Sequence, residues 1–439
     1  MSTPARERSS FRAVFAVGEF RTLWFSQILS GGGDRLALVA LTILIYDRTH
    51  SPLLAAVAYA AGNVPYIFGA LFLAGLADRL PRRGVMATCD MVRAGLVTVM
   101  LLPHLPLTAL IGLLYVVTAV QPPFDAARSA ITRDILPKDQ YAAGAATAQM
   151  TMRMLVVGGA AIGGLAVALI GARSALGVDD ATFIASGALV QFGLRPRPAA
   201  QSPSTGANSG NRHKPNAIRQ LAQGTRIVFG DRALRTLMLF GWMAAFYELP
   251  EGIAAPYAGS LHGGSTVTGI LIACTNVGAV IVAPFFTKRI GPLTRLRWMG
   301  PLACCACGTL VLTVLHPGLI GTMVIFAVAG SFAIYQIPAN TAFMERIPNE
   351  SRAQAFGLAN AGLVVGQGVA FAVAGAAIEW FPASDVVAAS GAIGAVGAIY
   401  LTLRWRGIAP AVGRHSARHL ARQSAAPLPA GSTPPMPVR

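Results

Sequence analysis

Charged residues are scarce in this chain of 439 residues. Asp, Glu, Lys and Arg make up only 12% of it, whereas hydrophobic residues make up 54%. A water-soluble domain carries about 25% charged residues. Because half that share cannot cover a large protein with a hydrated surface, the composition excludes an ordinary soluble protein. We expect lipid to surround most of the chain.

Lysine and cysteine are also rare. Neither residue type occurs in a motif that binds nucleotide phosphates or a metal ion. The three lysines, Lys138, Lys214 and Lys288, lie outside any G-x-x-x-x-G-K-[ST] loop of the kind that binds nucleotide phosphates. The five cysteines lie in apolar runs, and Cys304 and Cys307, which share a helix face, lack the further ligands and the nearby His or carboxylate of a metal site. The sequence also lacks a G-x-S-x-G nucleophile elbow. We therefore expect no cofactor, no metal and no enzymatic activity.

Twelve apolar runs are long enough to cross a membrane, which takes about 20 residues each. The first six lie at 22–46, 53–76, 86–103, 107–127, 142–170 and 174–194. The second six lie at 234–258, 266–287, 298–316, 318–341, 354–380 and 384–403. Prolines at 122, 123 and 338 predict that the fourth and tenth runs are the least regular. We expect an all-α integral membrane protein with twelve transmembrane helices in two pseudo-symmetric six-helix bundles.

Basic residues are divided unevenly between the two sets of loops. Of 35 lysines and arginines, Arg48 and Arg173 fall on one set, three fall inside spans, and 30 fall on the other set and the termini. Loops rich in Lys and Arg stay in the cytoplasm. We expect a multi-pass protein of the cell membrane with both termini cytoplasmic. The net charge of +17 comes from short clusters between spans, so nucleic acid is not an expected partner.

The two halves of the chain repeat each other. Arg21–Leu23 before the first span matches Arg235–Leu237 before the seventh at an offset of 214, and Pro137 matches Pro348 at an offset of 211. Matches in the same order at nearly one offset indicate a duplication, and six spans per half give both halves the same orientation. We expect a bundle at 1–194, a flexible linker at 195–220, a second bundle at 221–404 and a disordered tail at 405–439.

The repeat pairs two acids near the bilayer centre. Adding 214 to the number of Asp34 gives Glu248, and each lies in the first span of its half. An acid at that depth costs at least about 2.5–3.5 kcal/mol, so function or pairing must retain it. It can carry a proton, or it can be a structural acid neutralised by a buried arginine. Arg35 and Arg153 are the candidate partners, and Glu251 either joins this site or is solvated.

A basic loop, Gly75–Gly84, separates spans two and three. Such a loop can simply mark the cytoplasmic side, or it can be the gate of a transporter. Acids and arginines just inside the neighbouring spans could join it in one charge cluster, or each could reach the interface independently. The candidate cytoplasmic gate comprises Gly75, Asp78, Arg79, Arg82, Arg83, Asp90, Arg93 and Arg128.

The fifth span contains a run of small residues, Gly159–Gly164, in which Gly159, Gly163 and Gly164 are the glycines. The G-x-x-x-G spacing is typical of closely packed membrane helices.

These segments together resemble the major facilitator superfamily, specifically its drug and siderophore exporters of the enterobactin- and macrolide-efflux type. Gly75–Arg83 is similar to the superfamily signature G-x-x-x-D-R-x-x-R-R, with a difference of one residue after the glycine. Gly159–Gly164 is similar to the exporter signature G-P-x-x-G-G, with alanine in place of proline. The resemblance implies that Asp78 braces the start of the eleventh helix, near 351–356, when the transporter is open to the outside.

The resemblance and the paired acids lead to one functional prediction. We expect a secondary transporter that exports a small amphipathic molecule, such as a drug, natural product or siderophore, in exchange for protons. Asp34 is the expected proton carrier. The alternatives are metabolite uptake by the same fold and a non-transporting membrane protein. The expected partners are a small-molecule substrate, protons and membrane lipids, and we expect a monomer.

Overall fold

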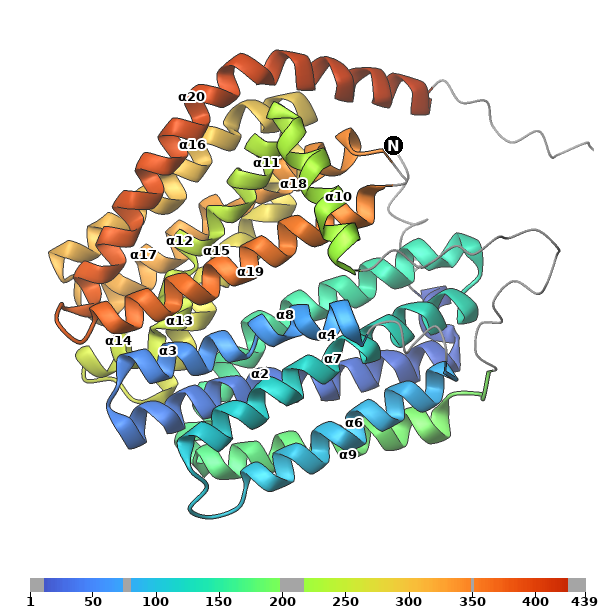
Figure 1. Ribbon diagram of the computed structural model, residues 1–439, viewed down its shortest axis with the longest axis vertical. Coiled ribbons are helices and arrows are strands. Elements are labelled where there is room, and N and C mark those ends of the chain that lie inside the picture. The colour runs from blue at the N-terminus through green and yellow to red at the C-terminus, as the bar shows by residue number, and fades with distance from the viewer. Residues whose placement is uncertain (1–11, 74–79, 198–216, 349–350, 425–439) are drawn as a thin grey trace, which may run out of the picture.

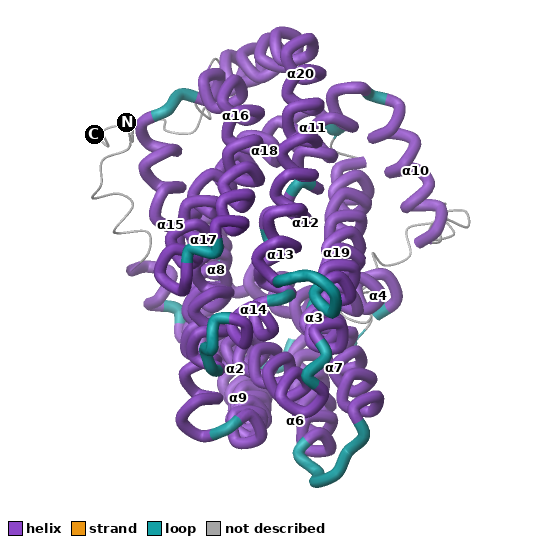
Figure 2. Tube along the Cα trace, turned by 90° about the vertical axis from the view of Figure 1, so that its left-hand side faces the viewer, coloured by secondary structure: helices purple, strands orange, loops and turns teal. Residues whose placement is uncertain are grey.

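The first half of the chain forms one helical bundle. The computed structural model describes residues 12–73, 80–197, 217–348 and 351–424, and within them Figure 2 shows helices and loops but no strand. The bundle consists of α2 (Gly18–Thr49), α3 (Pro52–Ala61), α4 (Val64–Phe72), α6 (Arg82–Met100), α7 (Leu107–Ile135), α8 (Lys138–Ile170) and α9 (Ala172–Gly193).

The second half forms a second bundle, preceded by the helix α10 (Ala217–Gly230). Its first span is divided into α11 (Arg232–Trp242), α12 (Ala244–Tyr247), α13 (Leu249–Gly252) and α14 (Ala254–Ser260). The others are α15 (Ser265–Arg289), α16 (Pro292–Leu310) with η1 (Val311–Leu315), α17 (Gly318–Phe332) with η2 (Ala333–Tyr335) and α18 (Gln336–Arg346), α19 (Arg352–Ala377) and α20 (Ala383–Ser424).

Nine helices in the described residues are long and apolar enough to cross a membrane. The three further spans of the predicted twelve correspond to α6, α9 and the divided segment α11–α14. Both α6 and α9 contain several charged residues, and α11–α14 is interrupted. All three pack among the longer helices, so the all-helical fold with twelve membrane segments is confirmed.

The duplication is visible in the helix register. α2 begins at Gly18 and α11 begins at Arg232, an offset of 214 in residue number. α8 begins at Lys138 and α19 begins at Arg352, which is the same offset. Equivalent helices of the two halves therefore begin at the spacing that the short sequence matches indicated.

The two bundles meet along two pairs of helices, α8 with α15 and α3 with α19. Gly164 and Gly269 bring the first pair into backbone contact, because a Cβ built on Gly164 would lie 2.8 Å from the Cα atom of Gly269. The short helix α14 packs against α2 and α3 at the distal end, which holds the loops at 50–51 and 261–264. Figure 1 shows the bundles joined there and diverging toward the proximal end, where the start of α2 and the end of α20 lie.

Several helices are less regular than a simple span, and prolines explain most of the breaks. The seventh span breaks at Met243, Glu248 and Ile253, and the last two breaks are close to Pro250 and Pro256. The tenth span contains the 3-10 turn η2 just before Pro338, whose ring removes a backbone donor. The fourth span, in contrast, remains one helix through Pro122 and Pro123, so the predicted irregularity there is wrong.

The segment after the twelfth span differs from the predicted disordered tail. α20 continues to Ser424, so residues 405–424 are helical and the boundary at 405 is wrong. This stretch contains many alanines and arginines, which are strong helix formers, and only one proline. Residues 425–439 and most of the predicted linker, 198–216, lie outside the described residues.

Candidate functional site

A buried arginine connects three helices of the N-terminal bundle. Arg93 of α6 is 1% exposed and forms an ion pair with Asp34 of α2. A terminal nitrogen of Arg93 donates a hydrogen bond to Ser30 Oγ at 3.1 Å, and its guanidinium carbon lies 4.2 Å from the ring centre of Phe183 in α9. Removing one member of such a buried pair costs about 3–5 kcal/mol, because it leaves an uncompensated charge.

The arginine that pairs with Asp34 differs from the predicted ones. The sequence suggested Arg35 or Arg153, but Arg93 takes this place. Asp90 is also internal, since it is 0% exposed and accepts hydrogen bonds from Ser186 at 2.6 Å and from Ser30 at 3.4 Å. Asp90 and Arg93 therefore lie inside the bundle rather than in a charge cluster with the loop Gly75–Gly84, because their shared helix face points toward α2 and α9.

A third acid of this cluster, Asp179 of α9, is absent from the predicted site. It is 1% exposed, and within the part of the chain that the structure describes neither of its carboxylate oxygens has a hydrogen-bond partner. Gly33 allows its close approach to α2, because a Cβ at that position would lie 2.3 Å from Asp179 Oδ1. A cavity of about 50 Å³ adjoins it and is also lined by Asp34 and Arg35. The sequence signal was the pair Asp179–Asp180 in an otherwise apolar span.

In the C-terminal bundle, Glu251 lies where the two halves meet. Its carboxylate accepts hydrogen bonds from Thr275 Oγ1 at 2.9 Å and Asn276 Nδ2 at 2.8 Å, both in α15. It accepts a third, at 3.0 Å, from the hydroxyl of Tyr59 in α3 of the other half. Glu251 is therefore part of the joint between the bundles, and no sequence signal pointed to Tyr59 as its partner.

Glu248 lies one turn before Glu251 and accepts a hydrogen bond from Gln367 of α19. The two predicted arginines interact electrostatically with the acids of the second half. The charge of Arg35 acts on Glu251, and that of Arg153 acts on Glu248. Glu248, Glu251 and Arg35 are half-buried, and Arg153 is exposed. Together they form a set of charges of both signs between the halves.

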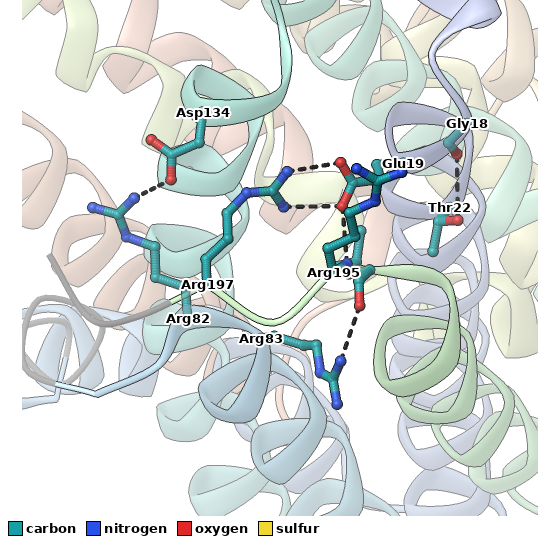
Figure 3. Close-up of polar contacts among 9 residues, drawn as sticks. Gly18, Glu19, Thr22, Arg82, Arg83, Asp134, Arg195 and Arg197 are labelled. Carbon is teal, nitrogen blue, oxygen red and sulfur yellow. Dashed lines mark hydrogen bonds and ion pairs between the residues drawn. The ribbon is translucent and has the colours of Figure 1, made fainter.

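The described part of the predicted gate forms contacts at the proximal end. Arg82 forms an ion pair with Asp134 at the end of α7, and Arg83 donates to the carbonyl oxygen of Leu194 at 3.0 Å (Figure 3). Next to them, Arg197 donates two hydrogen bonds to Glu19, at 2.7 and 3.0 Å. The Glu19 carboxylate raises the pKa of the Arg197 guanidinium.

Gly75, Asp78 and Arg79 lie outside the described residues, so the bracing role of Asp78 stays a prediction. Arg128 forms an ion pair with Asp125 one turn earlier in α7, at 3.1 Å, and Tyr66 of α4 donates to the same carboxylate at 3.2 Å. The structure therefore places Arg128 in its own small group rather than with Arg82 and Arg83.

The glycines of the fifth span lie where other helices come closest to α8. A Cβ at Gly159 would lie 2.7 Å from Arg35 Cβ, and one at Gly163 would lie 3.4 Å from the Cα atom of Leu36. Gly164 contacts α15 of the other half instead, since a Cβ there would lie 2.5 Å from the carbonyl oxygen of Ser265. The run thus packs α8 against α2 and joins the bundles.

Solved transporters share this fold at low sequence identity. A POT family transporter in complex with 5-aminolevulinic acid has a TM-score of 0.67 and 11% identity, covering 90% of this chain and 96% of that chain. The nucleoside transporter NupG has a TM-score of 0.61 and 15% identity over 89% and 98%. A bacterial homolog of the human lysosomal transporter Spinster, inward-facing and unoccupied, has a TM-score of 0.58 and 14% identity over 92% and 97%. Such identities show the fold alone.

Comparison at the sequence level is more specific. The MFS-type transporter YkuC of Bacillus subtilis (strain 168), itself uncharacterized, is 29% identical over 247 residues, which cover 54% of this chain and 57% of the relative. The chain therefore spans little more than half the length of this relative. A family model described as Major Facilitator Superfamily matches residues 23–362, well over half of the chain. The protein is a multi-pass membrane transporter rather than an enzyme, and it belongs to the Major Facilitator Superfamily.

Proposed function

We propose that the protein exports a small amphipathic molecule, such as a drug, natural product or siderophore, in exchange for protons. One observation carries this proposal. Asp34 and Glu248 lie equally far along the chain from the first residues of α2 and α11, which are Gly18 and Arg232. Each half thus holds an acid at the same position in its first span. Placing an acid at this depth of the membrane costs free energy, so such an acid is retained where it has a function.

Protonation of either acid changes contacts that hold helices together. Asp34 binds Arg93 as a carboxylate, and a neutral carboxyl group would weaken that ion pair between α2 and α6. Glu248 binds Gln367 of α19, and Glu251 one turn later binds Tyr59 of the other half. A proton that moves between such acids can therefore bias the halves toward one of two arrangements, which is the requirement of alternating access.

The proposed substrate site lies between the halves and is lined by α2, α7, α11–α14 and α17–α18. Arg35 and Glu248 would supply its polar contacts, and the apolar faces of the spans would hold the rest of an amphipathic molecule. Export, rather than uptake, is supported by the resemblance of Gly159–Gly164 to the exporter signature.

Uptake into inverted membrane vesicles with an imposed pH gradient tests this function. A panel of amphipathic dyes and antibiotics is offered, and we expect accumulation of at least one when the lumen is acidic. Asp34→Asn should abolish gradient-driven accumulation, because the side chain can no longer take up or release a proton. An unchanged rate and pH dependence in this variant would contradict the assigned role of Asp34. Substrate counterflow only in the uptake direction would favour a metabolite importer.

A further inference from the structure

The charge cluster inside the N-terminal bundle contains more acids than bases. The guanidinium of Arg93 pairs with Asp34 and also interacts electrostatically with the carboxyl groups of Asp90 and Asp179. Asp34 forms the ion pair, and Asp90 accepts hydrogen bonds from Ser186 and Ser30. The carboxyl group of Asp179 has neither an ion pair nor a hydrogen bond with any described residue, although Asp179 is 1% exposed.

A buried carboxylate without hydrogen bonds costs several kcal/mol, and such groups bind a proton instead of staying charged. The neighbours of Asp179 do not remove this cost. Besides the groups named above, the charged residues near it are Arg35 on α2 and Asp180 on α9, and Asp180 accepts a hydrogen bond from Thr98 at 3.1 Å. The adjoining residues of α7, Thr118 and Gln121, are uncharged.

The space beside Asp179 offers a route for the proton. The adjoining cavity of about 50 Å³ exceeds the roughly 10–15 Å³ that one water needs. Its lining includes Asp179, Asp34 and Gln121, which can bind water. A water there could accept a proton from Asp179 Oδ1 or Oδ2 as hydronium and leave the carboxylate behind.

We propose that Asp179 is a proton-binding site of this transporter, protonated in the conformation described, and that it competes with Asp34 for Arg93. When Asp179 loses its proton, its carboxylate attracts the guanidinium that otherwise pairs with Asp34. The ion pair between α2 and α6 then weakens, so release of one proton changes the strength of a contact between helices. This inference rests on the proposed function insofar as the proton is the coupling ion.

Infrared difference spectroscopy of the purified protein tests the protonation directly. A protonated carboxyl group gives a C=O stretching band that shifts in heavy water and disappears on titration. We expect one such band at neutral pH in the wild type and in Asp180→Asn, a matched control on the same helix whose own carboxylate has a partner. The band should be missing in Asp179→Asn, which keeps the shape of a neutral carboxyl group and should fold. Its persistence in Asp179→Asn, together with its loss in Asp34→Asn, would overturn the proposal.

Sodium is the other ion that an acidic cavity could hold. The same variants are heated in sodium chloride and in choline chloride at equal concentration. Thermal stabilisation specific to sodium, present in the wild type and lost in Asp179→Asn, would overturn the proposal in favour of a sodium site. Equal unfolding temperatures in the two salts agree with a proton.

Transport separates failure of this inference from failure of the proposed function. If Asp179→Asn loses pH-driven accumulation but keeps substrate counterflow, both stand. If the wild type shows no proton coupling while the band still depends on Asp179, the proposed function fails and the protonation of Asp179 stands. If the wild type couples to protons and Asp179→Asn couples equally, the inference fails and the function stands.

Discussion

The most informative contact at the scale of single residues is the hydrogen bond between Tyr59 and Glu251. Tyr59 is 4% exposed and lies in the first half, whereas Glu251 belongs to the second. A typical intramolecular hydrogen bond contributes about 0.5–1.5 kcal/mol. This contact therefore favours the arrangement in which the distal ends of the two bundles are joined.

Tyr59→Phe removes this bond and should shift the protein toward a state with separated distal ends. Spin labels on the distal loops at 50–51 and 261–264 would report a larger share of long distances. Tyr66→Phe is the matched control, because its hydroxyl bonds Asp125 within the same half, at 3.2 Å. An equal shift in both variants, or none in Tyr59→Phe, would contradict the role assigned to this contact.

Sequence reasoning found the charged residues of the interior but not their partners. The offset of the repeat was enough to place Asp34 and Glu248 at equivalent positions. It could not show that Arg93 pairs with Asp34, because pairing depends on which helices are neighbours and on which way each face points. Asp179 was missed although it follows a simple rule, since an acid inside an apolar span is a functional candidate wherever it occurs.

At the scale of elements, the closest contact between the halves depends on α8 having no side chain at Gly164. A Cβ there would meet backbone atoms of α15 at 2.5 and 2.8 Å, which cannot move as a flexible side chain can. Overpacking of this kind costs about 1–3 kcal/mol. The exporter-like run in the fifth span thus has a packing role at the interface, whatever else it does.

Gly164→Ala should lower the midpoint of thermal unfolding of the purified protein and separate α8 from α15. Gly158→Ala is the control in the same helix, because a Cβ at Gly158 meets nothing within 4 Å. That control should be neutral or slightly stabilising, by up to about 1 kcal/mol, since alanine favours helix more than glycine does. Equal effects of the two substitutions would refute the claim of close backbone contact.

The start of α11 offers a test of electrostatics outside the membrane spans. Asp231 caps this helix by accepting hydrogen bonds from the backbone of Ala233 and Leu234 at 2.7 and 3.3 Å, and Arg346 donates to it at 2.9 Å. Partial burial raises the pKa of Asp231, but these hydrogen bonds outweigh it and hold the pKa below its ordinary value. The ionised carboxylate of Asp231 therefore stabilises the fold at pH values above the ordinary pKa of aspartate. This stabilisation is lost as the pH falls through the lowered pKa of Asp231.

Asp231→Asn keeps a capping side chain but removes the charge. Between about pH 5 and pH 3, the unfolding temperature of the wild type should fall more steeply than that of the variant. At neutral pH the variant should be less stable by about 1 kcal/mol or less, as expected for a pair that is partly exposed to solvent. Parallel curves for the two proteins over this range would contradict the lowered pKa.

The order and number of the helices could be predicted from hydropathy, but their breaks could not all be predicted. The seventh span is divided close to the prolines at 250 and 256, whereas the pair at 122 and 123 left α7 intact. Neighbouring helices decide whether a proline bends a membrane helix, and a single sequence does not contain that information. The helical end of α20 was not predicted for a related reason. It contains one proline and two serines, which are typical of irregular segments, among a run of helix-forming residues.

At the scale of the whole molecule, two copies of one six-span unit are joined at their distal ends and diverge toward the proximal end (Figure 1). Asp34 in the first span of one copy, and Glu248 and Glu251 in the first span of the other, each have a partner on a neighbouring helix. The mixed charges between the halves explain how a change of protonation would reach both bundles at once. Alternating access in exchange for protons is the behaviour that this arrangement supports best.

Proton movement driven by substrate tests this mechanism most directly. Inverted vesicles are acidified inside, and the lumen pH is followed with a fluorescent dye while a candidate substrate is added outside. We predict that the substrate releases protons from the lumen with the wild type, but not with Asp34→Asn or in vesicles without the protein. Accumulation of the substrate without any release of protons, or the same release with Asp34→Asn, would contradict proton-coupled export through Asp34.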